Sequence, residues 1–258
     1  MYGDFILIER DGGVSTSAQR LPDKDTAGRT EAWLRDTLLA HPEIIPVQDI
    51  DSSFGPIVPL CKELRTSAGP IDAAFINQYG KLTLVECKLW RNPESRRKVV
   101  AQILDYATAV SKWSYSDLQS NVARALGRPG NAPYEIVKEK FPEVSEHRFI
   151  DSTASSMRQG RFLLIIAGDG IREDVSAIAE YIRNASTGFS LGLVEVAMYG
   201  LPNSGIAVQP RILAKTKIIE KTIYFARHQP SDLPINNSGV ELSDDVEESS
   251  DPGGSEVG

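Results

Sequence analysis

Three charged residues stand on either side of one predicted turn and have the types that metal-assisted hydrolysis uses. Asp72 precedes the turn, and Glu86 and Lys88 follow it, within the segment GPIDAAFINQYGKLTLVECKLW at residues 69–90. Charged groups are costly inside a protein unless they are paired or bound to a metal. The segment therefore predicts either a surface hairpin or a hairpin whose charged residues form a working site.

The turn fixes how the two predicted strands pair. Strand-like residues occupy 71–76 and 82–89, and residues 78–80 form a three-residue loop whose glycine stands where a left-handed conformation is needed. In this register the numbers of paired residues sum to 158, which places Asp72 opposite Glu86. Facing residues of an antiparallel pair have Cβ atoms about 4.5–5.5 Å apart. We therefore expect the two carboxylates to be close neighbours.

Lys88 and a metal ion are the expected partners of these carboxylates. Strand alternation puts Lys88 on the same face as Glu86, and two facing acids repel each other without a cation between them. Mg²⁺ or Mn²⁺ would be held by Asp72, Glu86 and the backbone carbonyl of Cys87. The metal would neutralise a phosphate and acidify a water, which Lys88, its pKa lowered by the metal, would orient or deprotonate.

A helix predicted over residues 31–41 brings a further carboxylate. Thr30 is the expected N-cap, and Glu31 falls on the same side of the helix as Leu34 and Leu38. Glu31 either supports the metal site or complements the helix dipole from the first turn. The sequence leaves both interpretations open.

A second helix is predicted to begin at Asn92, with Pro93 at its first position. The apolar stripe of this helix is formed by Val99, Ile103 and Val110. Gln102 and Tyr106 are one turn apart and lie on nearly the same side of the helix. Gln102 is expected to anchor a water or a phosphate, with Tyr106 packing beneath it. The candidate nucleic-acid-binding residues are Arg91, Arg96, Arg97, Lys98 and Tyr106. Alternatively, the four basic residues of this set form a helix face that is exposed to solvent and contacts no nucleic acid.

These motifs together resemble a known superfamily. GPID, VECK on the following strand and QILDY on the next helix are similar to the PD-(D/E)xK nucleases, including the Q-x-x-x-Y motif of RecB-type members. The matching residues are Asp72, Glu86-Cys87-Lys88, Gln102, Tyr106 and, on the first core helix, Glu31. The resemblance covers about residues 30–112. The chain resembles the archaeal-type mismatch endonucleases more distantly. It implies a restriction-endonuclease-like core that cleaves DNA with a divalent metal.

The expected fold is α/β, with a mixed central sheet flanked by helices. Five segments are predicted: an N-terminal strand and flexible linker (1–29), the nuclease core (30–112), a helical insertion or cap (113–160), a C-terminal β-α-β extension (161–227) and an acidic tail (228–258). The tail should be disordered. The extension would either continue the first sheet or form a small subdomain.

Charge and composition restrict the partners only weakly. The net charge of the 258 residues is −7, but the tail holds eight acidic and no basic residues, which leaves the remainder at +1. A nucleic-acid partner is therefore compatible with the acidic total. Cys61 and Cys87 form neither a disulfide framework nor a zinc motif, which suits a cytoplasmic protein. No apolar run approaches a membrane span, so no membrane partner is expected.

The sequence thus predicts a metal-dependent deoxyribonuclease acting in DNA repair or defence. A catalytically silent member of the same fold, binding nucleic acid or a protein partner, is the main alternative, and a phosphodiesterase for small nucleotides is a third. RNA as substrate, a homodimer and a protein partner for the acidic tail are left open.

Overall fold

The computed structural model describes residues 5–8, 11–13, 15–21, 29–89, 95–168, 188–201 and 205–216, and of residues 95–97 it describes the backbone alone. All of these lie in one compact unit, residues 1–219. The N-cap predicted at Asn92, a helix expected over 172–185 and the acidic tail are outside the described residues.

Within these ranges the chain forms eight strands that belong to one sheet. They are β1 (Phe5–Ile8), β2 (Ser15–Arg20), β3 (Val58–Thr66), β4 (Gly69–Ile76), β5 (Leu82–Lys88), β6 (Phe162–Gly168), β7 (Ser190–Gly200) and β8 (Ile206–Thr216). The α-helices are α1 (Glu31–Ala40), α2 (Val47–Asp51), α3 (Ser95–Ser111), α4 (Tyr115–Leu126), α5 (Ala132–Lys140) and α6 (Glu146–Arg158), with short 3-10 turns at Pro42–Ile44 and Ser52–Phe54.

The sheet is mixed, and its strand order is β1-β2-β7-β6-β5-β4-β3, with β8 paired to β7 as a branch off this order. The strands β3, β4 and β5 pair antiparallel, whereas β5, β6 and β7 run parallel to one another. The mixed α/β class predicted from the sequence is therefore confirmed. The strands β6 and β7 continue the first sheet, which decides between the two arrangements that the sequence allowed.

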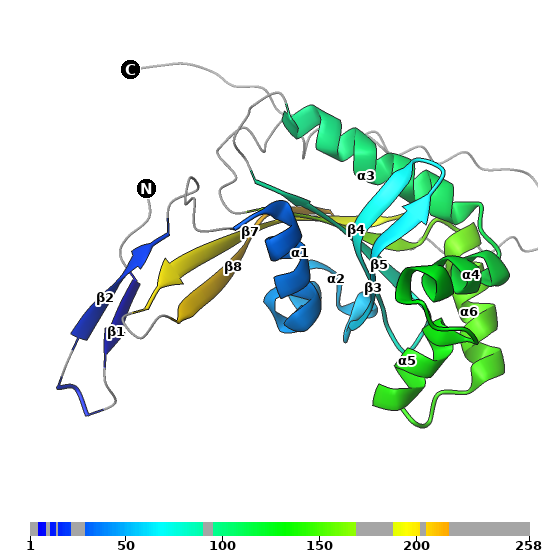
Figure 1. Cartoon of the computed structure of the whole chain (residues 1–258), viewed down its shortest axis with the longest axis horizontal. Helices are drawn as coiled ribbons and strands as arrows, with labels where there is room; N and C mark the ends of the chain where they lie inside the picture. Colours follow the sequence, from blue (N-terminus) through cyan, green and yellow to red (C-terminus); the bar gives the residue numbers. More distant parts are fainter. Residues whose placement is uncertain are drawn as a thin grey trace, which may run out of the picture. The chain divides into compact units, whose positions relative to one another are not determined.

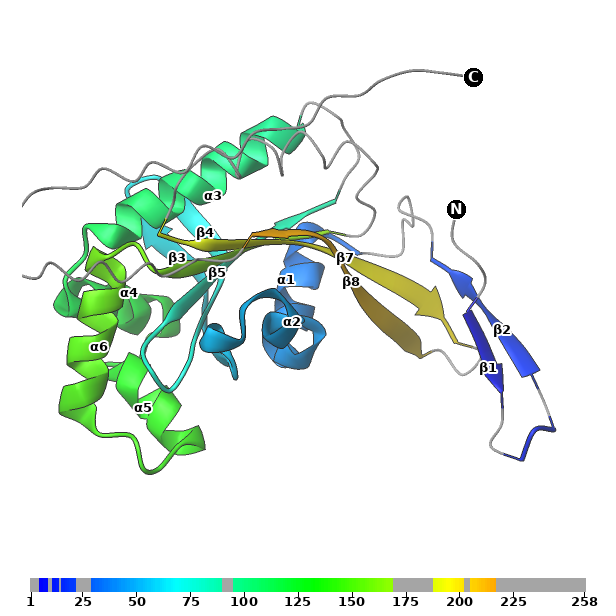
Figure 2. The same cartoon turned by 180° about the vertical axis from the view of Figure 1, so that it is seen from behind.

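Helices cover both faces of this sheet, as Figures 1 and 2 show from opposite sides. The helices α3 to α6 bury one face around Ile103, Leu118 and Phe149. The helix α1 packs on the opposite face, where Leu34 and Leu38 are fully buried. Residues 113–160 form helices as predicted, and these helices share the main core with α3. The charged residues of β4 and β5 thus lie between two helical layers.

The predicted hairpin is formed in the predicted register. The observed pairs of β4 and β5, from Ala73 with Val85 to Ile76 with Leu82, all have numbers that sum to 158. Gly80 has a φ of +74°, and the side chain of the buried Asn77 accepts hydrogen bonds from two backbone N–H groups of the loop. The register holds because the turn and the two-residue strand period demand the same pairing.

Three features were not predicted. The strand β2 lies within residues 1–29, where we expected a flexible linker after the first strand. The short helix α2 and the strand β3, which pairs with β4, lie within residues 42–68, where no helix or strand was predicted. A strand pair was also expected within residues 206–225; the structure describes one long strand there, β8, and residues 217–225 lie outside the described residues. Among the described residues, no helix combines the length and the apolar composition needed to cross a membrane.

Candidate active site

The ends of β4 and β5 bring Asp72, Glu86 and Lys88 together. Extending the observed register by one pair places Asp72 opposite Glu86, and the Lys88 Nζ lies 2.9 Å from Glu86 Oε1. Asp72 Oδ2 accepts a hydrogen bond of 2.8 Å from the backbone N–H of Cys87. The two carboxylates and the ammonium therefore converge as the turn geometry predicted.

Glu31 joins this group from the first turn of α1. Thr30 caps the helix by accepting a hydrogen bond from the Trp33 N–H, which fixes where α1 begins. Glu31 Oε1 accepts a hydrogen bond of 3.2 Å from the Leu89 N–H, and Oε2 lies 3.7 Å from Lys88 Nζ. Glu31 thus stands in the first turn of α1 and also contacts the lysine of the candidate site, while its support of a metal stays a prediction.

Burial makes the carboxylates unusually basic. The side chain of Glu86 is 2% exposed, and burial together with the charge of Asp72 raises its pKa to about 7, against an opposing effect of Lys88. The pKa of Asp72 is also raised by burial, although the hydrogen bond from Cys87 and the charge of Lys88 oppose this shift. Burial is the largest cause of both shifts, so each acid is harder to ionise here than in water.

The pKa of Lys88 is raised, which is the opposite of the predicted direction. Burial by itself lowers it, but the hydrogen bond to Glu86 and the charges of Glu86, Glu31 and Asp72 outweigh that effect. The prediction assumed an adjacent divalent cation, which would act in the other direction. The carboxylates alone hold Lys88 in its charged form.

Glu86 has an oxygen that fits a cation. Its Oε2 is buried and has no hydrogen-bond partner among the described residues, and such an orphaned acceptor is costly. The described parts of the chain hold no cluster of three or more His, Cys, Asp or Glu side chains arranged around a metal. A site built on Asp72, Glu86 and the Cys87 carbonyl still suits Mg²⁺, which takes one or two carboxylates and keeps several waters.

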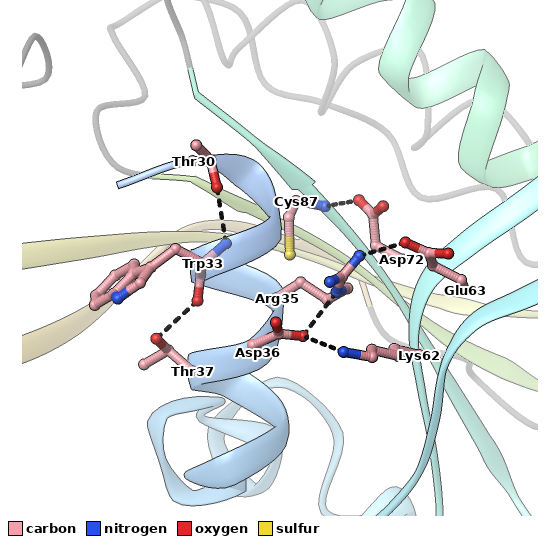
Figure 3. A network of polar contacts seen from close by, with 9 residues as sticks. All are labelled: Thr30, Trp33, Arg35, Asp36, Thr37, Lys62, Glu63, Asp72 and Cys87. Carbon is pink, nitrogen blue, oxygen red and sulfur yellow. Dashed lines mark hydrogen bonds and ion pairs between the residues drawn. The ribbon is translucent and has the colours of Figure 1, made fainter. Parts of the chain in front are cut away.

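Arg35 is a component of the site that was not predicted from the sequence (Figure 3). It is 8% exposed, and its guanidinium donates to Glu63 Oε1 at 2.7 Å and to Asp36 Oδ1 at 3.0 Å. Glu63 stands at the β3 position opposite Asp72, with a left-handed φ of +49°. Arg35 also opposes the rise in the pKa of Asp72. Its position one helical turn after Glu31 is the sequence feature that would have revealed it.

Gln102 and Tyr106 lie beside the site on α3. The Gln102 Nε2 donates to the Tyr106 hydroxyl at 2.6 Å. Burial raises the pKa of Tyr106, and the charges of Glu86 and Asp72 add to that effect. Tyr106 is only 2% exposed, which leaves almost no surface for a nucleic acid. The structure favours the packing role for Tyr106 over the nucleic-acid contact.

Cys87 is a packing residue. Its side chain is fully buried in the apolar cluster on the α1 face of the sheet, away from Lys88 as the strand alternation predicted. Burial raises the pKa of its thiol far above the ordinary value. Both properties make it a poor nucleophile.

The predicted basic cluster is described only in part. Arg91 lies outside the described residues, and Arg96 and Arg97 lie in α3 without described side chains. Lys98 is exposed on the first turns of α3. Their contact with phosphates therefore stays a prediction.

Comparisons with known proteins do not place this chain in a family. No family model, no curated protein and no solved structure matched it. The functional argument therefore rests on the residues and their geometry.

Proposed function

We propose that this protein is a divalent-metal-dependent nuclease that hydrolyses phosphodiester bonds of DNA. The observation that carries the proposal is the convergence of Asp72, Glu86 and Lys88 at the ends of two paired strands, where a buried oxygen of Glu86 has no partner among the described residues. Asp72, Glu86 and the Cys87 carbonyl would hold Mg²⁺ or Mn²⁺. That ion would supply positive charge to the phosphate and lower the pKa of an attacking water.

The protein side chains have separate roles in this proposal. The Lys88 side chain is 23% exposed, and its ammonium is held by Glu86 and Glu31. It would orient the attacking water and neutralise charge that develops on the phosphate. Glu31 would act as a positioning residue, because it contacts Lys88 and the N–H of the residue that follows it. Gln102 would anchor a water or a phosphate oxygen from the α3 side.

The site favours a metal-assisted reaction over one that uses the lysine alone. The buried Glu86 and the half-buried Asp72, both with raised pKa values, face a single ammonium. A divalent cation would balance that charge and stabilise the ionised form of both acids. We infer that the substrate is DNA from the resemblance of the sequence motifs to those of the PD-(D/E)xK nucleases.

The test is cleavage of labelled single-stranded, duplex and branched DNA and of RNA, each with Mg²⁺, Mn²⁺ or EDTA. Wild type is compared with Asp72→Asn and Lys88→Met. The matched controls are Glu135→Gln, a 40% exposed carboxylate on α5 that pairs with Arg128, and Lys140→Met. Thermal unfolding of every variant confirms that it is folded.

Cutting that requires metal, is lost in both site variants and persists in both controls would support the proposal and name the substrate. Cutting that survives both site variants would refute the assignment of the site. The main alternative, a silent nuclease-fold protein, predicts no cutting by wild type and no Mn²⁺ binding that depends on Asp72, as measured by calorimetry.

A further inference from the structure

We propose that Arg35 and Glu63 are positioning residues of the candidate active site, and that their ion pair keeps Asp72 in place opposite Glu86. This inference rests on the proposed function, because Asp72 and Glu86 are the acids that would hold the metal there. Neither Arg35 nor Glu63 would touch the metal or the DNA. Both would act through the backbones of β3 and β4.

Glu63 has a backbone conformation that its residue type rarely adopts. Its φ is +49°, and among the described residues it is the only one other than glycine with a positive φ. In this left-handed region the Cβ of an L-residue lies too close to the following carbonyl oxygen. Such conformations persist only where surrounding contacts enforce them, and they cluster at functional sites. The conformation of Glu63 therefore requires a contact that enforces it.

Glu63 lies directly across from Asp72 in the sheet. The pairs of β3 and β4 on either side of this position are Lys62 with Ala73 and Leu64 with Ile71. Two acids that face each other across an antiparallel pair are destabilising. The carboxylate of Glu63 is instead tied to α1, because its Oε1 accepts a hydrogen bond of 2.7 Å from the Arg35 guanidinium. Arg35 is therefore the contact that holds Glu63.

Arg35 is itself fixed by its neighbours. It is 8% exposed, its Nε donates to Asp36 Oδ1 at 3.0 Å, and Lys62 Nζ lies 3.5 Å from the same oxygen. With Glu63 these residues carry two positive and two negative charges, so the cluster is balanced without Asp72. Figure 3 shows Arg35 and Glu63 beside Asp72, on the side of α1 that faces β3 and β4.

Helix α1 thereby holds both strands that flank β4. One turn before Arg35, Glu31 accepts a hydrogen bond from the N–H of Leu89, which directly follows β5. Arg35 holds β3 through Glu63. Because β4 pairs with β3 on one edge and with β5 on the other, these two contacts of α1 set where Asp72 lies relative to β5.

This arrangement suits positioning better than stability. The side chain of Glu63 is 63% exposed, and an ion pair with an exposed partner contributes little to stability because solvent screens it. The left-handed backbone of a residue with a Cβ opposes folding. Groups that orient metal ligands from outside the metal's own shell typically matter for metal affinity and activity. The ion pair of Arg35 and Glu63 thus gives the fold little and the place of Asp72 much.

The experiment compares two replacements of Glu63 that differ in backbone strain. Glu63→Gly and Glu63→Ala both remove the carboxylate, but only glycine adopts a positive φ readily. Calorimetry of the full chain gives the affinity for Mn²⁺, and thermal unfolding in EDTA gives the stability. Cleavage of DNA gives kcat and KM.

Two further variants test whether the two residues act as a pair. They are Arg35→Gln and the double variant Arg35→Gln/Glu63→Ala. The matched controls are Arg128→Gln and Glu135→Ala, which break an ion pair of 2.8 Å beside α5. Should an Arg35 variant fail to fold, the comparison of Glu63→Gly with Glu63→Ala decides alone.

We expect Glu63→Gly to unfold roughly 2–4 °C above Glu63→Ala, because alanine retains the strain. Both should weaken Mn²⁺ binding to the same extent, by roughly tenfold. Arg35→Gln should weaken it similarly and the double variant no further, since the two residues act as one unit. The kcat should fall while the KM for DNA stays unchanged, because neither residue touches the DNA. The control variants should keep the Mn²⁺ affinity of wild type.

An unchanged Mn²⁺ affinity in Glu63→Gly and in Arg35→Gln would overturn the inference. A loss of affinity that is larger in Glu63→Ala than in Glu63→Gly would overturn it too, because metal binding would then follow stability alone. Losses that add up in the double variant would contradict the action of the two residues as a pair.

The same measurements separate this inference from the proposed function. Mn²⁺ binding that depends on Arg35 and Glu63 in a protein that never cuts DNA would uphold the inference and refute the nuclease proposal. Metal-dependent cutting that is indifferent to both residues would do the reverse. A wild type that neither binds Mn²⁺ nor cuts DNA would overturn both.

Discussion

Replacing Glu86 by glutamine should remove a pH dependence from the stability of the metal-free protein. Glu86 is nearly inaccessible to solvent, and burial with the charge of Asp72 raises its pKa from an ordinary 4.5 to about 7. A group whose pKa is higher in the folded than in the unfolded state stabilises the fold while it is protonated. That contribution is fully present below about pH 4.5 and is lost as the pH rises through about 7.

The size of this change in the free energy of unfolding follows from the size of the pKa shift of Glu86. Each pKa unit corresponds to about 1.4 kcal/mol, so a rise from 4.5 to about 7 corresponds to about 3 kcal/mol of unfolding free energy. Glutamine has almost the same shape, and its carbonyl can still accept the hydrogen bond from Lys88. Its amide would leave a buried N–H group without a partner, which costs about 1–3 kcal/mol at every pH. The Glu86→Gln variant is therefore less stable than wild type at low pH. Its free energy of unfolding lacks the pH dependence that the ionisation of Glu86 causes in wild type.

The assay is urea unfolding in EDTA at half-unit steps from pH 4.5 to 8.5. The free energy of wild type minus that of Glu86→Gln should fall by about 3 kcal/mol between the two ends of this range. Glu139→Gln, an exposed carboxylate paired with Arg128 at 3.4 Å, is the control for general effects of charge removal. A difference between wild type and Glu86→Gln that stays constant across the range would refute the account of Glu86.

The same measurement with Mg²⁺ links the electrostatics to the proposed metal. At pH 8, a hundredfold excess of Mg²⁺ over its Kd should stabilise wild type by about 2.7 kcal/mol. Glu86→Gln should gain clearly less, because it has lost one anionic ligand. Equal stabilisation of wild type and variant would mean that Mg²⁺ does not bind at Glu86.

Two further predictions concern residues that shape the site. Gly80→Ala should unfold the chain or destabilise it by more than about 3 kcal/mol, since the added Cβ would lie 2.0 Å from Thr153 Oγ1 at a φ of +74°. Gly127→Ala, at a φ of +62° with open space around it, should cost only about 1 kcal/mol, so similar losses in thermal unfolding would contradict the argument. Arg35→Met should cost about 1–2 kcal/mol in urea unfolding, because it removes two charged hydrogen bonds whose carboxylate partners are themselves largely exposed. An unchanged midpoint would show that these bonds contribute nothing.

The local chemistry of the sequence determined the centre of the candidate site. The glycine at position 80 and the amide of Asn77 specify one turn, and the two-residue strand period then fixes which side chains face each other. For this reason the sequence alone sufficed to pair Asp72 with Glu86 and to place Lys88 beside them. Thr30 fixed the start of α1 by the same kind of local argument, since a cap depends on residues three positions apart.

Only the tertiary structure decided what surrounds that centre. The contact of Arg35 with Glu63 depends on where α1 packs and on β3, a strand that local patterns did not predict. Arg20 and Glu195 are 175 positions apart in the chain, and they meet because β2 pairs with β7, the strand that carries Glu195. Strand order is set by how the apolar faces of all the elements are buried together, which no short stretch of sequence contains. The turn therefore specified the central residues of the candidate site, and the assembled sheet specified their neighbours.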